Sequence, residues 1–482
     1  MIESPLLRNL DGYISGVWVS ADSGQTFDVH NPANGEKLAE VAAMGREETL
    51  RAIEAARTAL KQPASLDQRR EWLFAIAQAL KDNREEIGRI LCSEHGKPWK
   101  EGQGEADYAA GFFEFAARNI DALKPHPLED KPRGCTWTVH YRPAGVVGLI
   151  TPWNFPIGMI AKKLSSAIAA DCPSVIKPSS KTPLTMIALF TLLDRIGLPP
   201  GKVNLVMGSS GPIGDTLMEH PEVAVVSFTG STSVGQRLIE QSAAQVKKLC
   251  LELGGNAPFI VFEDADLDAA VEQLIANKFR GGGQTCVCAN RVFVHEQVSD
   301  DFAARLGERV AWLKVGDGML EDTDLGPLID RNGFEKVRRH AADAIAKGAR
   351  LVAGPDPDTL SADDGTFYPA SVVDGVTPAM ECWREETFGP LVPIVHFSDE
   401  DQVVAMANDT EFGLAAYVFT GDEARAERVI PQLTFGHVGH NTGSGPTPEA
   451  PFGGMKQSGF GREGGVEGLF EFIEPQTVPR GA

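Results

Sequence analysis

Between residues 145 and 228 the chain repeats one pattern, in which the apolar segments GVVGLI (145–150), SVIK (174–177), VNLVM (203–207) and VAVVSF (223–228) are each followed by a helix-like segment. We expect these helices to end near 171, to cover 183–196, to be short after 207 and to cover 232–248. Apolar strands that alternate with helices are typical of βαβ units, whose parallel strands are buried on both faces. The pattern therefore predicts an α/β fold with a doubly wound parallel sheet of the dinucleotide-binding type.

A second α/β series follows the glycine pair of ELGGN (252–256). It opens with PFIVF (258–262) and continues with an expected strand over 292–295 and expected helices over 264–279, 301–314 and 333–348. Before the first series, 17–19 and 27–29 have strand-like patterns, and a helical pattern runs from 47 to 92. The chain is thus predicted to form two α/β units with a helical layer from its N-terminal part.

Two further segments, 123–143 and 468–482, have extended, strand-like patterns and no obvious partner in either series. Exposed strand edges invite unwanted pairing, so arms of this kind more often form a sheet between subunits than free edges. We therefore expect these two segments to form an oligomerisation arm.

Charge and composition exclude several classes of function. The chain has 482 residues and a formal net charge of −21, and such a surface repels nucleic acid and anionic membranes. An anionic substrate would need a local basic pocket. Prolines at 152 and 156 interrupt the apolar stretch 144–161, so no membrane-spanning helix is expected.

The cysteines and the N-terminus indicate the expected compartment. Glu3 lies near the start of the chain and no basic segment leads into an apolar one, which favours a cytoplasmic protein over a secreted one. Seven scattered cysteines do not form a disulfide framework. There is no HExxH and no paired CxxC, so no metal site is predicted.

Cys286 is the first candidate for chemistry, because it follows a glycine-rich turn in GGGQTCVCANR (281–291). Backbone N–H groups of such a turn are free to stabilise an oxyanion beside the sulfur. The alternative is a buried free cysteine that acts as a small hydrophobe. Cys288 is expected to face away from Cys286 in a strand, as a structural residue or a redox partner. A papain-like peptidase would need a nearby histidine, and the nearest is His295.

Glu252 and Asn154 are the next candidates. Glu252 lies between apolar residues at the break between the two series, where a carboxyl is either structural or a general base with a raised pKa. Asn154 follows the strand 145–150, at the carboxyl end where open α/β sheets bind ligands. Its amide can donate to a developing oxyanion.

A phosphate-binding turn is expected at SFTGSTSVG (227–235), which joins a strand to the start of a helix. Unpaired N–H groups at a helix start suit a pyrophosphate, although an ordinary helix cap gives the same pattern. The G-x-G-x-x-G fingerprint is absent. Lys177 ends another strand of the same sheet and is placed to reach ribose hydroxyls.

Seven motifs together resemble the NAD(P)-dependent aldehyde dehydrogenase superfamily over nearly the whole chain. They are TPWNFP (151–156), VIKPSS (175–180), SFTGSTSVG (227–235), LELGGNAP (251–258), GQTCVCANR (283–291), EETFGP (385–390) and PFGGMKQSGFGREGG (451–465). Within that superfamily the chain most resembles the succinate-semialdehyde dehydrogenases.

The resemblance implies a subunit with three parts that assembles as a homodimer or homotetramer. These are a cofactor-binding domain of residues 1–122 and 144–251, a catalytic domain of residues 252–457, and an oligomerisation arm of residues 123–143 and 458–482. A non-catalytic scaffold on this fold would be expected to lack Cys286 or Glu252, and both are present. An enzyme that transfers the acyl group to coenzyme A need not keep a base at Glu252.

The resemblance also assigns roles to individual residues. Cys286 matches the nucleophile, Glu252 the general base and Asn154 the oxyanion amide, while Lys163 and Glu463 match residues proposed to relay protons. The cofactor NAD or NADP is expected to contact Trp153, Lys177, Ser180, Gly230, Ser231, Glu386 and Phe388. Because Ser180 stands where NAD-selective members have glutamate, we expect NADP to be accepted at least as well as NAD.

The substrate is expected to be an aldehyde with a distal carboxylate. In the succinate-semialdehyde branch two arginines and a serine hold that carboxylate. Arg280 matches one arginine, but Lys162 replaces the other and Pro446 replaces the serine. A lysine keeps the charge and loses the bidentate fork. Alternative substrates are 2-oxoglutarate semialdehyde or another bulkier aldehyde that fits beside Phe155 and Phe452.

Overall fold

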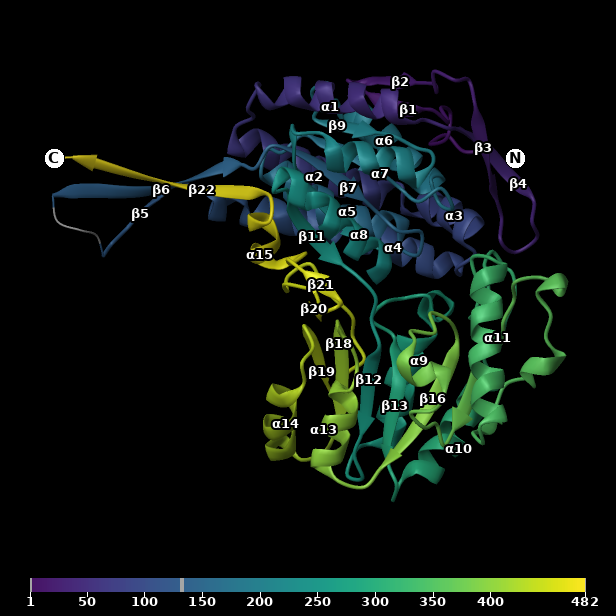
Figure 1. The fold of residues 1–482 in the computed structure, drawn as a ribbon. Coiled ribbons are helices and arrows are strands. Elements are labelled where there is room, and N and C mark those ends of the chain that lie inside the picture. The colour runs from purple at the N-terminus through teal and green to yellow at the C-terminus, as the bar shows by residue number, and fades with distance from the viewer. Residues whose placement is uncertain (1, 131–133, 482) are drawn as a thin grey trace.

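The protein consists of two α/β units and a projecting arm (Figure 1). The computed structural model describes residues 2–130 and 134–481. Residues 131–133 of the predicted arm therefore lie outside the described residues. No helix in the described ranges is long and apolar enough to cross a lipid bilayer.

The first unit is built on an eight-stranded sheet with the order β2-β1-β9-β8-β7-β10-β11-β21. Its strands are β1 (Gly12–Ile14), β2 (Val17–Val19), β7 (Val146–Ile150), β8 (Ser174–Lys177), β9 (Val203–Leu205), β10 (Val223–Thr229), β11 (Lys248–Glu252) and β21 (Gly459–Phe460). The five strands from β7 to β11 are parallel, and the chain winds outward from β7 in one direction and then from β10 in the other. The predicted doubly wound sheet is confirmed, and its switch point lies between β7 and β10.

Helices cover both faces of this sheet. One face packs on α2 (Leu66–Asp82), α3 (Arg84–His95), α4 (Trp99–Asn119), α5 (Pro156–Ala169) and α6 (Leu184–Ile196). The other packs on α1 (Arg46–Leu60), α7 (Ser210–Glu219) and α8 (Thr232–Ser242). Next to this unit, β3 (Thr26–His30) and β4 (Lys37–Ala42) form a hairpin. The helical pattern of 47–92 is thus three helices, and α4 continues that layer.

The second unit contains a seven-stranded sheet with the order β14-β15-β16-β13-β12-β18-β19. Its strands are β12 (Ala257–Val261), β13 (Ala289–His295), β14 (Arg350–Ala353), β15 (Ser371–Asp374), β16 (Leu391–Phe397), β18 (Ala415–Phe419) and β19 (His437–His440). The helices are α9 (Leu267–Lys278), α10 (Ser299–Val310), α11 (Arg331–Ala346), α12 (Glu381–Arg384), α13 (Glu400–Asn408) and α14 (Glu423–Val429). Only β14 pairs antiparallel in this sheet, which confirms the second α/β series.

The arm is a three-stranded antiparallel sheet of β5 (His126–Pro127), β6 (Cys135–Pro143) and β22 (Ile473–Gly481) that extends away from both units (Figure 1). It is shorter than predicted at the C-terminal side. Within residues 458–472, β21 pairs with β11 of the first sheet, and α15 (Gly465–Phe470) packs on α4 and α5. A smaller ribbon joins β17 (Phe412–Gly413) to β20 (Met455–Lys456).

Several predicted boundaries were wrong for local reasons. The helix expected over 232–248 ends at Ser242, because a short turn with Val246 at φ 49° leads into β11. The helix expected from 264 begins at Leu267, since the Asp266 carboxylate accepts a hydrogen bond from the Ala269 N–H. Such side-chain caps fix helix starts more sharply than apolar periodicity does.

Candidate active site

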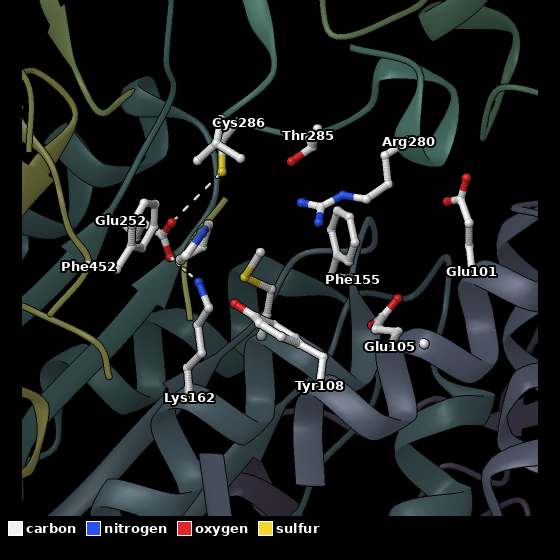
Figure 2. Close-up of a pocket in the computed structure, with 14 residues that line it drawn as sticks. Glu101, Glu105, Tyr108, Phe155, Lys162, Glu252, Arg280, Thr285, Cys286 and Phe452 are labelled. Carbon is white, nitrogen blue, oxygen red and sulfur yellow. Dashed lines mark hydrogen bonds and ion pairs between the residues drawn. The ribbon is translucent and has the colours of Figure 1, made fainter. Parts of the chain in front are cut away.

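Cys286 lies in the wall of two cavities at once. The first cavity, of about 320 Å³, is lined by Glu252 and Arg280 among others, and Figure 2 shows these side chains around it. The second cavity, of about 370 Å³, is lined by residues of both units. A molecule in either cavity can therefore reach the same sulfur atom.

The second cavity opens along the switch point of the first sheet. Trp153 and Asn154 follow β7, and Gly230 and Ser231 follow β10. A third cavity, of about 390 Å³, shares Trp153, Gly230 and Ser231 with the second and extends to Lys177. Open α/β sheets bind ligands at this place, outside the carboxyl ends of the strands.

Cys286 is held by a turn in which glycine is required. At Gly283, where φ is 74°, a Cβ atom would lie 2.4 Å from the Gly389 carbonyl oxygen, and a Cβ atom at Gly255 would lie 2.3 Å from the Cys286 carbonyl oxygen. The turn and the segment between β11 and β12 therefore approach one another closely. Burial and the charge of Glu252 raise the pKa of the Cys286 thiol, and the thiol must lose its proton before the sulfur becomes a nucleophile.

Glu252 supplies a carboxylate at the right place. The Cys286 Sγ lies 3.8 Å from Glu252 Oε1, and Glu252 is only 3% exposed. Desolvation raises its pKa, while the nearby Lys162 opposes that rise. A carboxyl with a raised pKa beside a nucleophile is suited to accept a proton near neutral pH.

Asn154 is buried and firmly oriented. Its side-chain amide nitrogen donates to the Gln284 backbone carbonyl at 2.9 Å. Its backbone carbonyl accepts from Lys97 Nζ at 2.7 Å. The Asn154 amide nitrogen carries two N–H bonds, so one is left beside the cavity wall. Asn154 thus comes next to the turn that carries Cys286.

Lys162, Lys163 and Glu463 form a buried charged cluster with Glu252. Lys163 pairs with Glu463 and also donates to Ser227 Oγ at 3.0 Å. Lys162 Nζ lies 3.7 Å from Glu463 Oε2 and 3.9 Å from Glu252 Oε2. The predicted substrate ligand Lys162 does line the first cavity, but its nearest anionic partners belong to the chain itself.

Arg280 lies on another side of the first cavity, with its guanidinium 5.2 Å above the centre of the Phe155 ring. Among the described residues it has no ion pair and no side-chain hydrogen bond. Phe452 and Pro446 complete the apolar wall. An exposed, unpaired guanidinium over an apolar floor is suited to bind a carboxylate.

The predicted nucleotide contacts mostly lie along the second and third cavities. Trp153, Lys177, Gly230, Ser231, Glu386 and Phe388 line one or both of them. Glu386 accepts from the Gly255 N–H at 3.1 Å, and burial raises its pKa to about 7. Lys177 donates to Ser210 Oγ at 2.8 Å, and burial lowers its pKa to about 8.

Ser180 differs from the other predicted contacts. Its hydroxyl donates to the Gly208 carbonyl at 3.0 Å, and the neighbouring Ser179 lines the third cavity in its place. Lys181 pairs with Asp330 of the second unit. The basic charge next to Ser180 is therefore already compensated within the protein.

Comparisons with known proteins decide the family. Residues 18–478 match the aldehyde dehydrogenase family. The chain belongs to this family. It is 45% identical to a 3-sulfolactaldehyde dehydrogenase of Pseudomonas putida, over 99% of this chain and 98% of that protein. It is 44% identical to a succinate-semialdehyde dehydrogenase [NADP(+)] of Escherichia coli, over 98% of each. The crystal structure of an oxidoreductase from Marinobacter aquaeolei is 64% identical, with a TM-score of 0.98 and full coverage of both chains.

The predicted resemblance to the aldehyde dehydrogenases is thus confirmed, and with it the fold class. One expectation about this family member was wrong. Cys286 and Cys288 do not alternate along a strand, because β13 begins at Ala289 and both cysteines lie in the preceding turn. Cys288 Sγ is buried and donates to the Gly283 carbonyl at 3.4 Å. Both thiols are free.

Sequence reasoning missed the supports behind Asn154. Lys97 pairs with Glu105 at 2.7 Å, and Glu105 accepts hydrogen bonds from the Ile157 and Gly158 N–H groups at the start of α5. Glu105 thereby satisfies two amide groups that no α5 side chain reaches. Charged residues are usually exposed, so no local signal distinguishes this buried pair.

Proposed function

We propose that this protein oxidises an aldehyde with a distal carboxylate, such as succinate semialdehyde, to the corresponding acid, with NAD or NADP as the hydride acceptor. The observation that carries the proposal is the position of Cys286, whose sulfur borders both the cavity with Glu252 and Arg280 and the cavity along the sheet's switch point. Membership of the aldehyde dehydrogenase family and relatives named for acidic aldehydes support it.

The residues along the second and third cavities fit a dinucleotide. A Cβ atom at Gly230 would lie 2.3 Å from the Phe228 ring, and the side chain of Ser231 does not cap α8. The N–H groups at the start of α8 are thus free for a pyrophosphate. Lys177 would hold the adenine ribose and Glu386 the nicotinamide ribose. When bound, the cofactor supplies a nicotinamide ring that accepts a hydride.

The residues of the chain divide the reaction into two steps. The Cys286 thiol first loses its proton to solvent water, and the thiolate sulfur attacks the aldehyde carbon to give a tetrahedral thiohemiacetal. The Cys286 N–H and the free Asn154 amide N–H stabilise its oxyanion. Loss of a hydride from that carbon leaves a thioester on Cys286. Glu252 then takes a proton from water, hydroxide adds to the thioester, and the carboxylic acid leaves with the Cys286 thiolate restored.

The distal carboxylate is proposed to bind Arg280, with the carbon chain between Phe155 and Phe452. Because Pro446 offers no hydroxyl to this carboxylate, a longer acid semialdehyde such as 2-oxoglutarate semialdehyde is the second candidate.

Glu252 beside the sulfur favours hydrolysis over transfer to coenzyme A. Lys163 and Glu463 are proposed to pass the proton from Glu252 onward.

Steady-state kinetics with aldehydes of increasing length test the proposal. With both cofactors, aldehydes that end in a carboxylate should show kcat/KM at least tenfold above neutral aldehydes of equal length. Equal values for the two series would contradict the substrate class, and no oxidation of any aldehyde would contradict the function itself.

Assembly through the arm is also proposed. β22 has a free edge within the described residues and extends for nine residues away from both units. Such an edge is suited to pair with a second copy of the chain in a homodimer or homotetramer. A cytoplasmic location stays a prediction. Deleting residues 473–482 should reduce the assembly to monomers in analytical ultracentrifugation, and an unchanged mass would contradict this role.

A further inference from the structure

Lys162 carries a buried charge to which the proposed reaction assigns no step. The residue is 2% exposed, and its ammonium lies 4.5 Å from the centre of the Phe452 ring. Within the described parts of the chain, Nζ has no hydrogen-bond partner. A buried ammonium without such partners is costly unless nearby charges compensate it.

Two carboxylates compensate this charge. Lys162 Nζ lies 3.7 Å from Glu463 Oε2 and 3.9 Å from Glu252 Oε2, so it stands between them. Figure 2 shows the ammonium directed at the Glu252 carboxylate, whose other oxygen faces Cys286. Together with Lys163, the cluster contains two cations and two carboxylates. It has no net charge left for a substrate carboxylate, whereas Arg280 is unpaired.

We propose that Lys162 is a positioning residue for the base, which keeps the Glu252 carboxylate ionised and directed at Cys286, and that Arg280 alone binds the distal carboxylate of the substrate. This inference rests on the proposed function. It assigns to Lys162 a role in thioester hydrolysis in place of the substrate contact expected from the sequence.

The groups that face Glu252 determine the direction of the effect. They are Lys162 and Lys163 from α5, Glu463 from the segment before α15, Thr229 from β10, Tyr108 from α4 and the thiol of Cys286. Burial and Glu463 raise the pKa of Glu252, and Lys162 is the largest influence that lowers it. Without Lys162 the pKa must rise further, because Lys163 then opposes burial and Glu463 without a second cation.

The experiment compares K162M, which keeps the length of the side chain without its charge, with K162R, which keeps the charge. The pH profile of kcat is measured with a carboxylate-bearing aldehyde and a neutral aldehyde of equal length. A base acts when deprotonated, so activity is lost as pH falls through its pKa. K162M should shift the acidic limb of the kcat profile to higher pH, by about one pH unit or more. At pH values below the new limb, this corresponds to roughly tenfold slower turnover.

Pre-steady-state kinetics separate the two steps. In K162M the first hydride transfer should outpace hydrolysis at the lower pH values and produce a burst of reduced cofactor, equally for both aldehydes. K162R should restore the wild-type limb. If K162M does not give a folded protein, K162Q removes the same charge and is held to the same expectation.

Other results would overturn the inference. A rise in KM confined to the carboxylate-bearing aldehyde, with an unmoved pH limb, would make Lys162 a substrate ligand. An unchanged profile for both aldehydes would show that the charge is not needed by Glu252. Wild-type protein that oxidises no aldehyde would contradict the proposed function instead, so the two failures are distinguishable.

Discussion

Replacing Arg280 by methionine tests how the proposed substrate is recognised. The guanidinium has no protein ion pair among the described residues and lies over Phe155, so its donors are available to a ligand. Charge-assisted hydrogen bonds contribute about 1.5–3 kcal/mol. Because Arg280 is exposed at the cavity wall, solvent screening favours the lower end. A loss of about 1.5 kcal/mol corresponds to roughly tenfold in kcat/KM.

The assay measures kcat/KM of wild type, R280M and R280K with a carboxylate-bearing aldehyde and a neutral aldehyde of equal length. R280M should lose about tenfold with the first and change little with the second. R280K should recover part of the loss, since it keeps the charge but not the fork. Equal losses for both aldehydes would refute the reasoning, because Arg280 would then support the turn before Cys286.

Two further predictions concern the cofactor and the second cysteine. Since residues 177–181 contain no carboxylate, kcat/KM with NADP should equal or exceed kcat/KM with NAD. A strong preference for NAD would show that this segment does not set the choice of cofactor. Because Cys288 Sγ is buried against the Gly283 carbonyl, C288A should be inactivated by peroxide as fast as wild type. Protection of activity in C288A would instead indicate a disulfide between Cys286 and Cys288, which requires the turn to rearrange.

The sequence was informative where local chemistry fixes the structure. The apolar segments 145–150 and 223–228 were predicted as strands of one doubly wound sheet, and the structure has β7 and β10 in that sheet. The glycine-rich turn indicated Cys286 as a candidate nucleophile, and Cys286 borders both cavities. The spacing along the chain did not predict that Glu252 lies beside Cys286. The resemblance to a known family implied it, and the distance of 3.8 Å between Cys286 Sγ and Glu252 Oε1 agrees with that implication.

Contacts between distant segments could not be predicted from the residues alone. Lys163 and Glu463 are 300 positions apart, and Lys162 reaches the same glutamate. Lys162 was expected to bind substrate because it stands where the succinate-semialdehyde branch has an arginine, whereas its carboxylate neighbours were not visible in the sequence. Lys97 was missed for the same reason, since its partners Glu105 and Asn154 meet it only in the folded chain.

The central claim is that Cys286 forms a covalent intermediate that Glu252 releases. The most direct test is a single-turnover experiment on E252Q, in which reduced cofactor is followed by absorbance and the protein by intact mass, with C286A as the control. E252Q should give at most one equivalent of reduced cofactor per subunit and retain the acyl group on Cys286, while C286A gives neither. Continued turnover of E252Q near the wild-type rate, or reduced cofactor without any gain in protein mass, would contradict the account.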